Sequence, residues 1–387
     1  MTPTSPASGY DPLGQVADHK TATLPPTRIA MASPTFGPEE AAAVQAVLTS
    51  GVLTNGPRTR QFEDEMALLH GTDHAVAMSS GTVALAAMLL AEGIGPGDEV
   101  IVPSLTFIAS ASSVLHVGAT PVFADVEADS FMLDPDDVEA RITAATRAIM
   151  PVHYAGQSAE LDRFQQMCQA HGLILLEDAA QAHGANFADR PVGSWGHSAM
   201  FSFTPTKNIT TGEGAVITTT DAALARHLRL LRNHGMSKQY HHEIVGYNWR
   251  LSELHAAIGV CQIPRLASIL ETKRANARLL ADLFEGVSDV RVPTELANRD
   301  HPYTLYTLTL PSELRERVAS ALSREGIETR VYFPPAHKQP IFAAHRVGPL
   351  PVTESLAERI LSIPFHWRLS RAELAEIAEI VIATVRA

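Results

Sequence analysis

HSAMFSFTPTKNITTGEGAVITT (197–219) places Lys207 between two strand-like apolar runs. A second stretch, LILLEDAAQAHG (173–184), carries Asp178 at the end of an apolar strand. A lysine held between strands and a carboxylate at a strand end suit pyridoxal phosphate (PLP). The lysine would hold the aldehyde as a Schiff base, and the carboxylate would keep the ring nitrogen protonated. Alone, each residue is more simply a surface lysine or a helix cap, so the hypothesis rests on the combination.

Short apolar strands alternate with helical segments from residue 74 onward. This alternation predicts βαβ units, a mainly parallel sheet and helices on both of its faces. We therefore expect an α/β fold in which ligands bind beyond the carboxyl ends of the strands. The strands that carry this prediction are HAVAM (74–78), EVIVP (99–103), TPVFADV (120–126), RAIMPVHY (147–154) and LILLED (173–178).

The pattern changes near residue 264, where a long helical segment begins. It leads to YTLYTLTL (303–310), which alternates as a strand does, and to the strand-like ETRVYF (328–333). The chain is therefore predicted to have three parts: a flexible N-terminal arm (1–28), a large PLP-binding α/β domain (29–264) and a small C-terminal α+β domain (265–387).

Composition limits the classes of function. Hydrophobic residues make up 45% of the 387 residues and charged residues 19%, which is typical of a globular protein. The net charge of −12 argues against a nucleic-acid partner. Two cysteines exclude a disulfide framework, and no apolar run reaches the roughly 20 residues that a membrane span needs. We therefore expect a cytoplasmic protein with no membrane partner.

SSGT (79–82) follows the strand HAVAM and leads into a helix. Backbone N–H groups at a helix start, together with the Thr82 hydroxyl, form an anion site that suits a phosphate group. A plain N-cap explains the same residues, so this motif leaves both readings open.

Five motifs occur together in this chain: SSGTVALAAML, PSLTFIASA, EDAAQAHGA, FSFTPTKNITTGEGA and YNWRLSELHAAIG. In order and spacing they resemble the DegT/DnrJ/EryC1/StrS family, over roughly residues 30 to 385. That family consists of PLP-dependent aminotransferases that act on keto sugars, usually nucleotide-linked. The resemblance implies an aspartate-aminotransferase-like (type I) fold, L-glutamate as the amino donor and a nucleotide-linked keto sugar as the acceptor.

The resemblance also assigns roles to residues. The Schiff-base lysine of the family falls on Lys207, where a dehydratase branch carries histidine, and its ring-nitrogen aspartate falls on Asp178. In the family, one residue contacts the cofactor phosphate in the active site of the partner subunit, across a dimer interface. This residue falls on Asn248, which implies a homodimer with shared active sites. The remaining implied cofactor contacts are Gln181 beside the ring, Phe107 on its other face, and Gly81, Thr82 and Ser202 at the phosphate.

Substrate contacts are predicted at Arg250, Tyr332 and His337, although His337 also suits a loop or core position. The stretch 103–126 resembles enzymes that aminate 4-keto-6-deoxy sugars. A 3-keto sugar or a keto-cyclitol stays an alternative acceptor, and so does formation of an aromatic amino acid.

Two readings of a different class remain. One is a PLP-binding partner protein without catalysis. The other is a metal-dependent hydrolase using His153, Asp178 and His183, which would leave Lys207 and SSGT unexplained.

Overall fold

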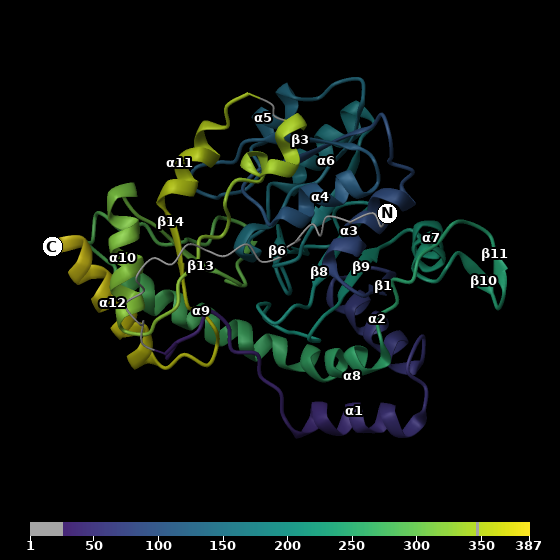
Figure 1. Cartoon of the computed structure of the whole chain (residues 1–387), viewed down its shortest axis with the longest axis horizontal. Coiled ribbons are helices and arrows are strands. Elements are labelled where there is room, and N and C mark those ends of the chain that lie inside the picture. Colours follow the sequence, from purple (N-terminus) through teal and green to yellow (C-terminus); the bar gives the residue numbers. More distant parts are fainter. Residues whose placement is uncertain (1–25, 346–347) are drawn as a thin grey trace, which may run out of the picture.

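A seven-stranded sheet forms the centre of the molecule (Figure 1). The computed structural model describes residues 26–345 and 348–387, so the predicted arm (1–28) lies almost entirely outside the described residues. The strand order is β1-β9-β8-β5-β4-β2-β3, and only β9 runs antiparallel to its neighbours. The predicted mainly parallel sheet is therefore confirmed. Its strands are β1 (His74–Met78), β2 (Glu99–Pro103), β3 (Thr120–Ala124), β4 (Thr146–Ile149), β5 (Ile174–Asp178), β8 (Ser198–Ser202) and β9 (Ala215–Thr219).

Helices cover both faces of this sheet, because successive strand residues point to opposite sides. In β1, Ala75 and Ala77 belong to one buried apolar cluster, and Val76 and Met78 belong to another. The first cluster is closed by α2 (Pro57–Leu69), α5 (Pro135–Ala140), α6 (Leu161–His171) and α8 (Glu253–Gln262), and the second by α3 (Gly81–Ala91), α4 (Ile108–His116) and α7 (Ala222–Arg232). Outside these layers, α1 (Pro38–Ser50) packs against α8.

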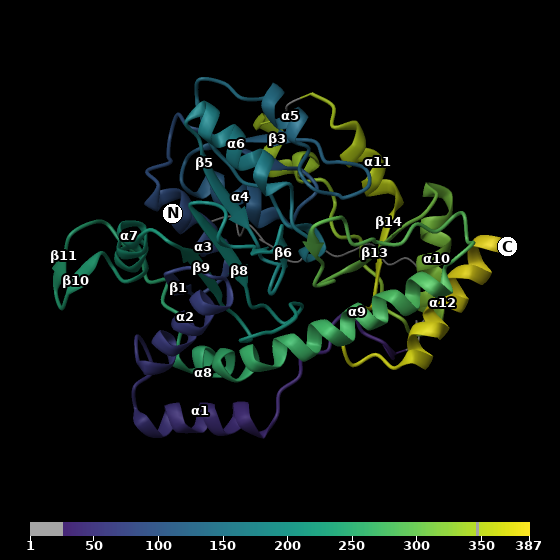
Figure 2. The same ribbon diagram turned by 180° about the vertical axis from the view of Figure 1, so that it is seen from behind.

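The C-terminal part has its own apolar cluster. Figure 2 shows α9 (Leu266–Leu283) running away from the sheet toward α10 (Ser312–Arg324) and α12 (Arg371–Arg386). These helices pack around the antiparallel pair β13 (Tyr306–Thr309) and β14 (Ile360–Ile363). Two small sheets complete the described strands. One has three strands, in the order β12 (Arg299–Asp300), β6 (Asn186–Phe187) and β7 (Arg190–Pro191), and the other pairs β10 (Met236–Lys238) with β11 (His241–His242).

One C-terminal segment returns to the central sheet. Ala336, Phe342 and Leu350 belong to the second cluster of the sheet, just before α11 (Pro351–Arg359). Hydrogen bonds to two residues of the central sheet's edge hold this segment in place. Asp125, directly after β3, accepts the N–H groups that open α11, and Ser104, after β2, accepts the backbone N–H of Ala336. The division at residue 264 remains a prediction, and the contacts of this strap (336–345 and 348–353) join the two predicted domains.

The strand expected at 328–333 does not form. Arg330 and Ser362 on β14 exchange two backbone hydrogen bonds as an isolated bridge, and the chain beyond Arg330 turns away from β14. Tyr332 and Phe333 turn instead toward a cavity at the edge of the central sheet. Within the described ranges no helix is both long and apolar enough to cross a membrane.

A buried carboxylate fixes the end of β5. Glu177 is fully buried and accepts N–H groups from Gly193 (2.9 Å), Trp195 (3.0 Å) and Gly196 (2.7 Å). His153 Nε2 lies 3.2 Å from its Oε2. Burial by itself would raise the pKa of Glu177, but the bonds from His153 and the backbone hold that pKa below its ordinary value of 4.5.

We expect Glu177→Gln to lower the free energy of unfolding by about 2–3 kcal/mol near neutral pH, since an amide nitrogen would face buried N–H groups. This loss of stability should be complete above about pH 4.5. It should shrink as the pH falls through the folded-state pKa of Glu177, which lies below 4.5, because the wild-type carboxylate gains a proton there. Urea unfolding across this range measures it, with the exposed Glu379→Gln on α12 as control. A pH-independent loss would contradict the assignment.

Candidate active site

The carboxyl ends of several strands meet at one edge of the sheet. β5 and β8 are parallel neighbours, and β1 points the same way because β9 is antiparallel to both β1 and β8. A cavity of about 420 Å³ lies at this edge. Most of the residues singled out from the sequence line it: Gly81, Thr82, Phe107, Asp178, Gln181, Ser202, Lys207 and Tyr332.

Asp178 presents a buried carboxylate to this cavity. Ser110 donates its hydroxyl to Oδ2 (2.6 Å), and the backbone N–H of Ala180 donates to Oδ1 (3.1 Å). Burial raises the pKa of Asp178, because it disfavours the ion, while these two donors and the charge of Lys207 oppose the rise. The pKa stays raised, so an additional donor facing Asp178 would favour its ionised form.

Lys207 lies on the loop between β8 and β9, where its backbone N–H donates to Thr204 O (3.0 Å). Burial lowers the pKa of Lys207 to about 8, because the ammonium ion loses hydration, and the Asp178 carboxylate opposes this shift. A lysine with this pKa has a large neutral fraction near physiological pH. Its Nζ can therefore act as a nucleophile and as a proton acceptor.

The N-terminus of α3 suits an anion. Ser80 is the N-cap and accepts the N–H of Val83, and Gly81 and Thr82 open the helix beside the cavity. A Cβ at Gly81 would lie 3.3 Å from Met200 Sδ, so the absent side chain leaves space there. Free N–H groups and the helix dipole favour a negatively charged group at this position.

Aromatic and amide side chains form the walls. Phe107, the N-cap residue of α4, is 56% exposed, and its ring centroid lies 5.8 Å from that of Phe333. Gln181 Oε1 accepts the N–H of Ala155 (2.7 Å), which fixes the orientation of the amide. Tyr332 lines the same wall as Phe333.

Three predicted contacts lie elsewhere. Asn248 is exposed and forms a backbone bridge with Asn233, whose side chain accepts a bond from Arg250 Nη1 (3.0 Å). His337 is buried, with Nδ1 2.6 Å from Ser104 Oγ and Nε2 3.3 Å from a Glu354 carboxylate oxygen. None of these three lines the cavity of a single chain.

Several residues of the site were missed by the sequence analysis. Thr106 lines the cavity, and its hydroxyl lies 2.7 Å from that of Ser110 on α4, which supports Asp178 from outside the lining. The rule that chemistry follows strand ends would have found both, since they follow β2 within PSLTFIASA. Thr304 comes from the chain leading into β13, and no local pattern marks it.

The residues of the metal-hydrolase alternative are engaged differently. His153 contacts Glu177, and the His183 ring packs against those of Phe203 (4.9 Å) and Phe201 (5.5 Å). In the part of the chain that the structure describes, no three His, Cys, Asp or Glu side chains are grouped to hold a metal ion. The geometry therefore gives this alternative no support.

Comparison with known proteins identifies the protein family. The sequence profile of the DegT/DnrJ/EryC1/StrS aminotransferase family matches residues 34–382. The chain belongs to this family. A UDP-N-acetyl-3-dehydro-α-D-glucosamine 3-aminotransferase from Acidithiobacillus ferrooxidans is 43% identical over 332 residues, 85% of this chain and 89% of the relative. GDP-perosamine synthase from Caulobacter vibrioides is 40% identical over 360 residues, 90% and 96% of the two chains.

Solved structures agree with the sequence relatives. The crystal structure of S. venezuelae DesV in complex with a ketimine intermediate matches this aminotransferase with a TM-score of 0.86 and 40% identity, over 89% of this chain and 94% of DesV. The predicted family, the type I fold class and the aminotransferase activity are therefore confirmed.

We expect Asp178→Asn to lower the pKa of Lys207 below its value of about 8, because the carboxylate is the charge that opposes the effect of burial. At a fixed pH near neutrality, more Lys207 would then be the neutral amine and would react faster with an acylating reagent. Competitive labelling across pH, read by mass spectrometry of the apoprotein, measures this pKa. The exposed Lys238 serves as the internal reference, and an unchanged or raised Lys207 pKa would contradict the pairing.

Proposed function

We propose that this aminotransferase uses pyridoxal phosphate to move an amino group from L-glutamate to the keto group of a nucleotide-linked 4-keto-6-deoxy sugar. The observation that carries the proposal is the cavity of about 420 Å³ in which Lys207 and Asp178 meet the N-terminus of α3. A cavity of this size and lining suits a cofactor with a negatively charged end and a basic ring nitrogen.

The residues present fit that cofactor. Asp178 would accept a hydrogen bond from the ring nitrogen, and Phe107 would cover one face of the ring with Gln181 beside it. The space left by Gly81, together with the Thr82 and Ser202 hydroxyls, would receive the phosphate. Lys207 would hold the cofactor covalently through Nζ. When bound, pyridoxal phosphate supplies an electron-withdrawing ring that stabilises negative charge developing on a substrate carbon.

The protein side of the reaction centres on Lys207. Its Nζ is neutral often enough near pH 8 to take the proton from the α-carbon of the amino donor, and it returns that proton later in the cycle. Asp178 stays ionised while it accepts the ring N–H, because a charged hydrogen bond opposes the effect of burial. Phe107, Tyr332 and Phe333 form an apolar part of the cavity wall, which would limit the access of water to a bound substrate.

The choice of substrate is supported by the relatives. Their names refer to UDP-linked and GDP-linked sugars, so a nucleotide-linked sugar is the expected acceptor class. We place Tyr332 at the sugar and Arg250 at the charged nucleotide portion in the site of a partner subunit, while His337 supports the wall through Ser104. A 3-keto nucleotide sugar is the second candidate, because the 43% identical relative is named as a 3-aminotransferase.

The test follows the two half-reactions. We expect the purified holoenzyme to change its visible absorbance on addition of L-glutamate, and borohydride to fix a pyridoxyl mass on the peptide that contains Lys207. The glutamate-treated enzyme should then aminate one member of a panel of 3-keto and 4-keto dTDP-, UDP- and GDP-sugars, detected by mass spectrometry. Amination of a 3-keto sugar instead, or of a keto-cyclitol added to the panel, would replace the acceptor assignment.

Lys207→Ala should reduce turnover by at least about a thousandfold, since it removes both the covalent tether and the proton carrier. Lys238→Ala, an exposed lysine removed in the same way, is the matched control. A wild-type holoenzyme that binds the cofactor without responding to glutamate would overturn L-glutamate as the amino donor.

We also propose a homodimer in which Asn248 of one subunit completes the site of the other. Its position outside the cavity of its own chain, on a segment tied to β1 through the Ser79–Trp249 backbone bond, is compatible with this role.

Subunit mixing tests the shared site. Lys207→Ala and Asn248→Ala homodimers should each be impaired, and mixing them with exchange of subunits should restore about a quarter of wild-type activity. The reason is that about half of the dimers would be mixed, each with one intact site. Mixing that restores nothing while mixed dimers form would overturn the shared site.

A further inference from the structure

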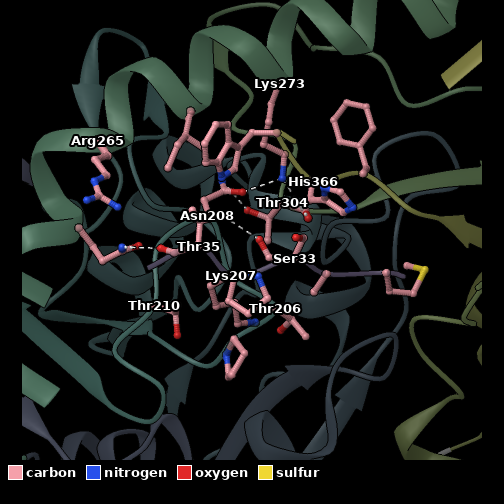
Figure 3. A pocket seen from close by; sticks show the side chains of 18 residues that line it. Ser33, Thr35, Thr206, Lys207, Asn208, Thr210, Arg265, Lys273, Thr304 and His366 are labelled. Carbon is pink, nitrogen blue, oxygen red and sulfur yellow. Dashed lines mark hydrogen bonds between the residues drawn. The ribbon is translucent and has the colours of Figure 1, made fainter. Parts of the chain in front are cut away.

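A second buried lysine lies behind Lys207. Lys273 comes from α9, is 4% exposed, and donates from Nζ to Asn208 Oδ1 (2.7 Å) and, at 3.5 Å, to the carbonyl oxygen of Thr304. Figure 3 shows it reaching down from the helix to Asn208, beside the labelled Lys207. Both oxygens are neutral, and burial lowers the pKa of Lys273 to about 7. A buried amine of this kind reduces stability unless another benefit offsets it, so its presence calls for a role.

Lys273 sets the direction of a hydrogen-bond chain. A lysine ammonium can only donate, so the oxygen of the Asn208 amide must face it. The Asn208 nitrogen then donates to the carbonyl of Pro302 (3.2 Å) and to Thr304 Oγ1 (3.1 Å). Because the Thr304 hydroxyl oxygen accepts a hydrogen bond from Asn208, its own O–H donates to the carbonyl oxygen of Gln181 (2.5 Å). Each member of the chain has one possible orientation.

This chain reaches both sides of the cavity. Asn208 is the residue after Lys207, and Gln181 lies three residues after Asp178 on the loop that follows β5. A pocket of about 40 Å³ separates Lys273 from the cavity and shares Thr206, Lys207 and Thr304 with it. The bonds therefore join α9, the Lys207 loop, the segment before β13 and the loop after Asp178.

We propose that Lys273 is a positioning residue for the reaction: by orienting the Asn208 amide it holds the Lys207 segment and Thr304 in the arrangement that directs Lys207 Nζ into the cavity. The inference rests on the proposed function, because it gives Lys207 its cofactor-binding role. A neutral Lys273 amine also keeps an N–H that can donate to Asn208, and the Pro302 carbonyl, which can only accept, favours the same amide orientation in either protonation state.

Lys273→Met tests the proposal, because methionine keeps an unbranched apolar stem of similar length but lacks the donor. Replacing a buried amine by an apolar side chain often leaves stability unchanged or higher. We therefore expect a melting temperature at or above that of wild type, together with a glutamate half-reaction slowed about 10- to 100-fold at a donor KM within about twofold. The apparent pKa of the visible absorbance of the cofactor joined to Lys207 should also shift.

Two further variants sharpen the test. Arg278→Met removes an exposed cation from the same helix and should match wild type in all three readouts. Asn208→Ala should slow the half-reaction as Lys273→Met does, and Lys273→Met added to it should change the rate by less than about twofold, since one acts through the other. If Lys273→Met does not fold, Asn208→Ala together with the absorbance titration still decides the question.

The outcomes separate the two proposals. The positioning role would be overturned if Lys273→Met kept the wild-type rate and absorbance pKa. It would also be overturned if the effects of Lys273→Met and Asn208→Ala multiplied in the double variant. Either result would leave the proposed function intact. A wild-type protein that forms no borohydride-fixable bond at Lys207 would instead overturn the proposed function.

Discussion

The parallel pairing of β5 with β8 is the constraint on which the site depends. Its register aligns Asp178 with Met200, so the carboxylate and the loop that begins after Ser202 leave the sheet at the same edge. Because successive strand residues face opposite sides, a slip of one residue would exchange Asp178 with Glu177. The hydrogen bonds that Glu177 receives from 193–196 oppose such a slip, since they fit only a carboxylate on the far side.

Two adjacent carboxylates in β5 thus behave in opposite ways. Glu177 is surrounded by donors, which outweigh burial and depress its pKa, whereas Asp178 accepts hydrogen bonds from Ser110 and the Ala180 N–H and keeps a raised pKa. The fold itself supplies the hydrogen-bond donors for Glu177, whereas Asp178 can accept a further hydrogen bond from a bound molecule. The same contrast holds for the lysines: Lys273 is engaged by Asn208 within the protein, while Lys207 opens onto the cavity.

The sequence predicted the parts of the site that follow strands. Asp178 and SSGT (79–82) sit at strand ends, where a local pattern and a general rule of parallel sheets suffice, whereas Ser202 was assigned by resemblance to the family. Thr304, Lys273 and the course of 328–333 could not be predicted, since they depend on how segments distant in sequence pack together. The proposed role of Asn248 requires a second copy of the chain, which one chain cannot display.

The strap that returns from the C-terminal part to β2 and β3 has a consequence for selectivity. Tyr332 and Phe333 lie immediately before it, and Ser104 and Asp125 anchor it to the ends of those strands. Any hinge movement of α10 and α12 would therefore leave this side of the cavity stationary. Discrimination between sugars would then arise in a preformed wall, so changing acceptor preference in the laboratory calls for exchanging the strap as a unit with its two anchors.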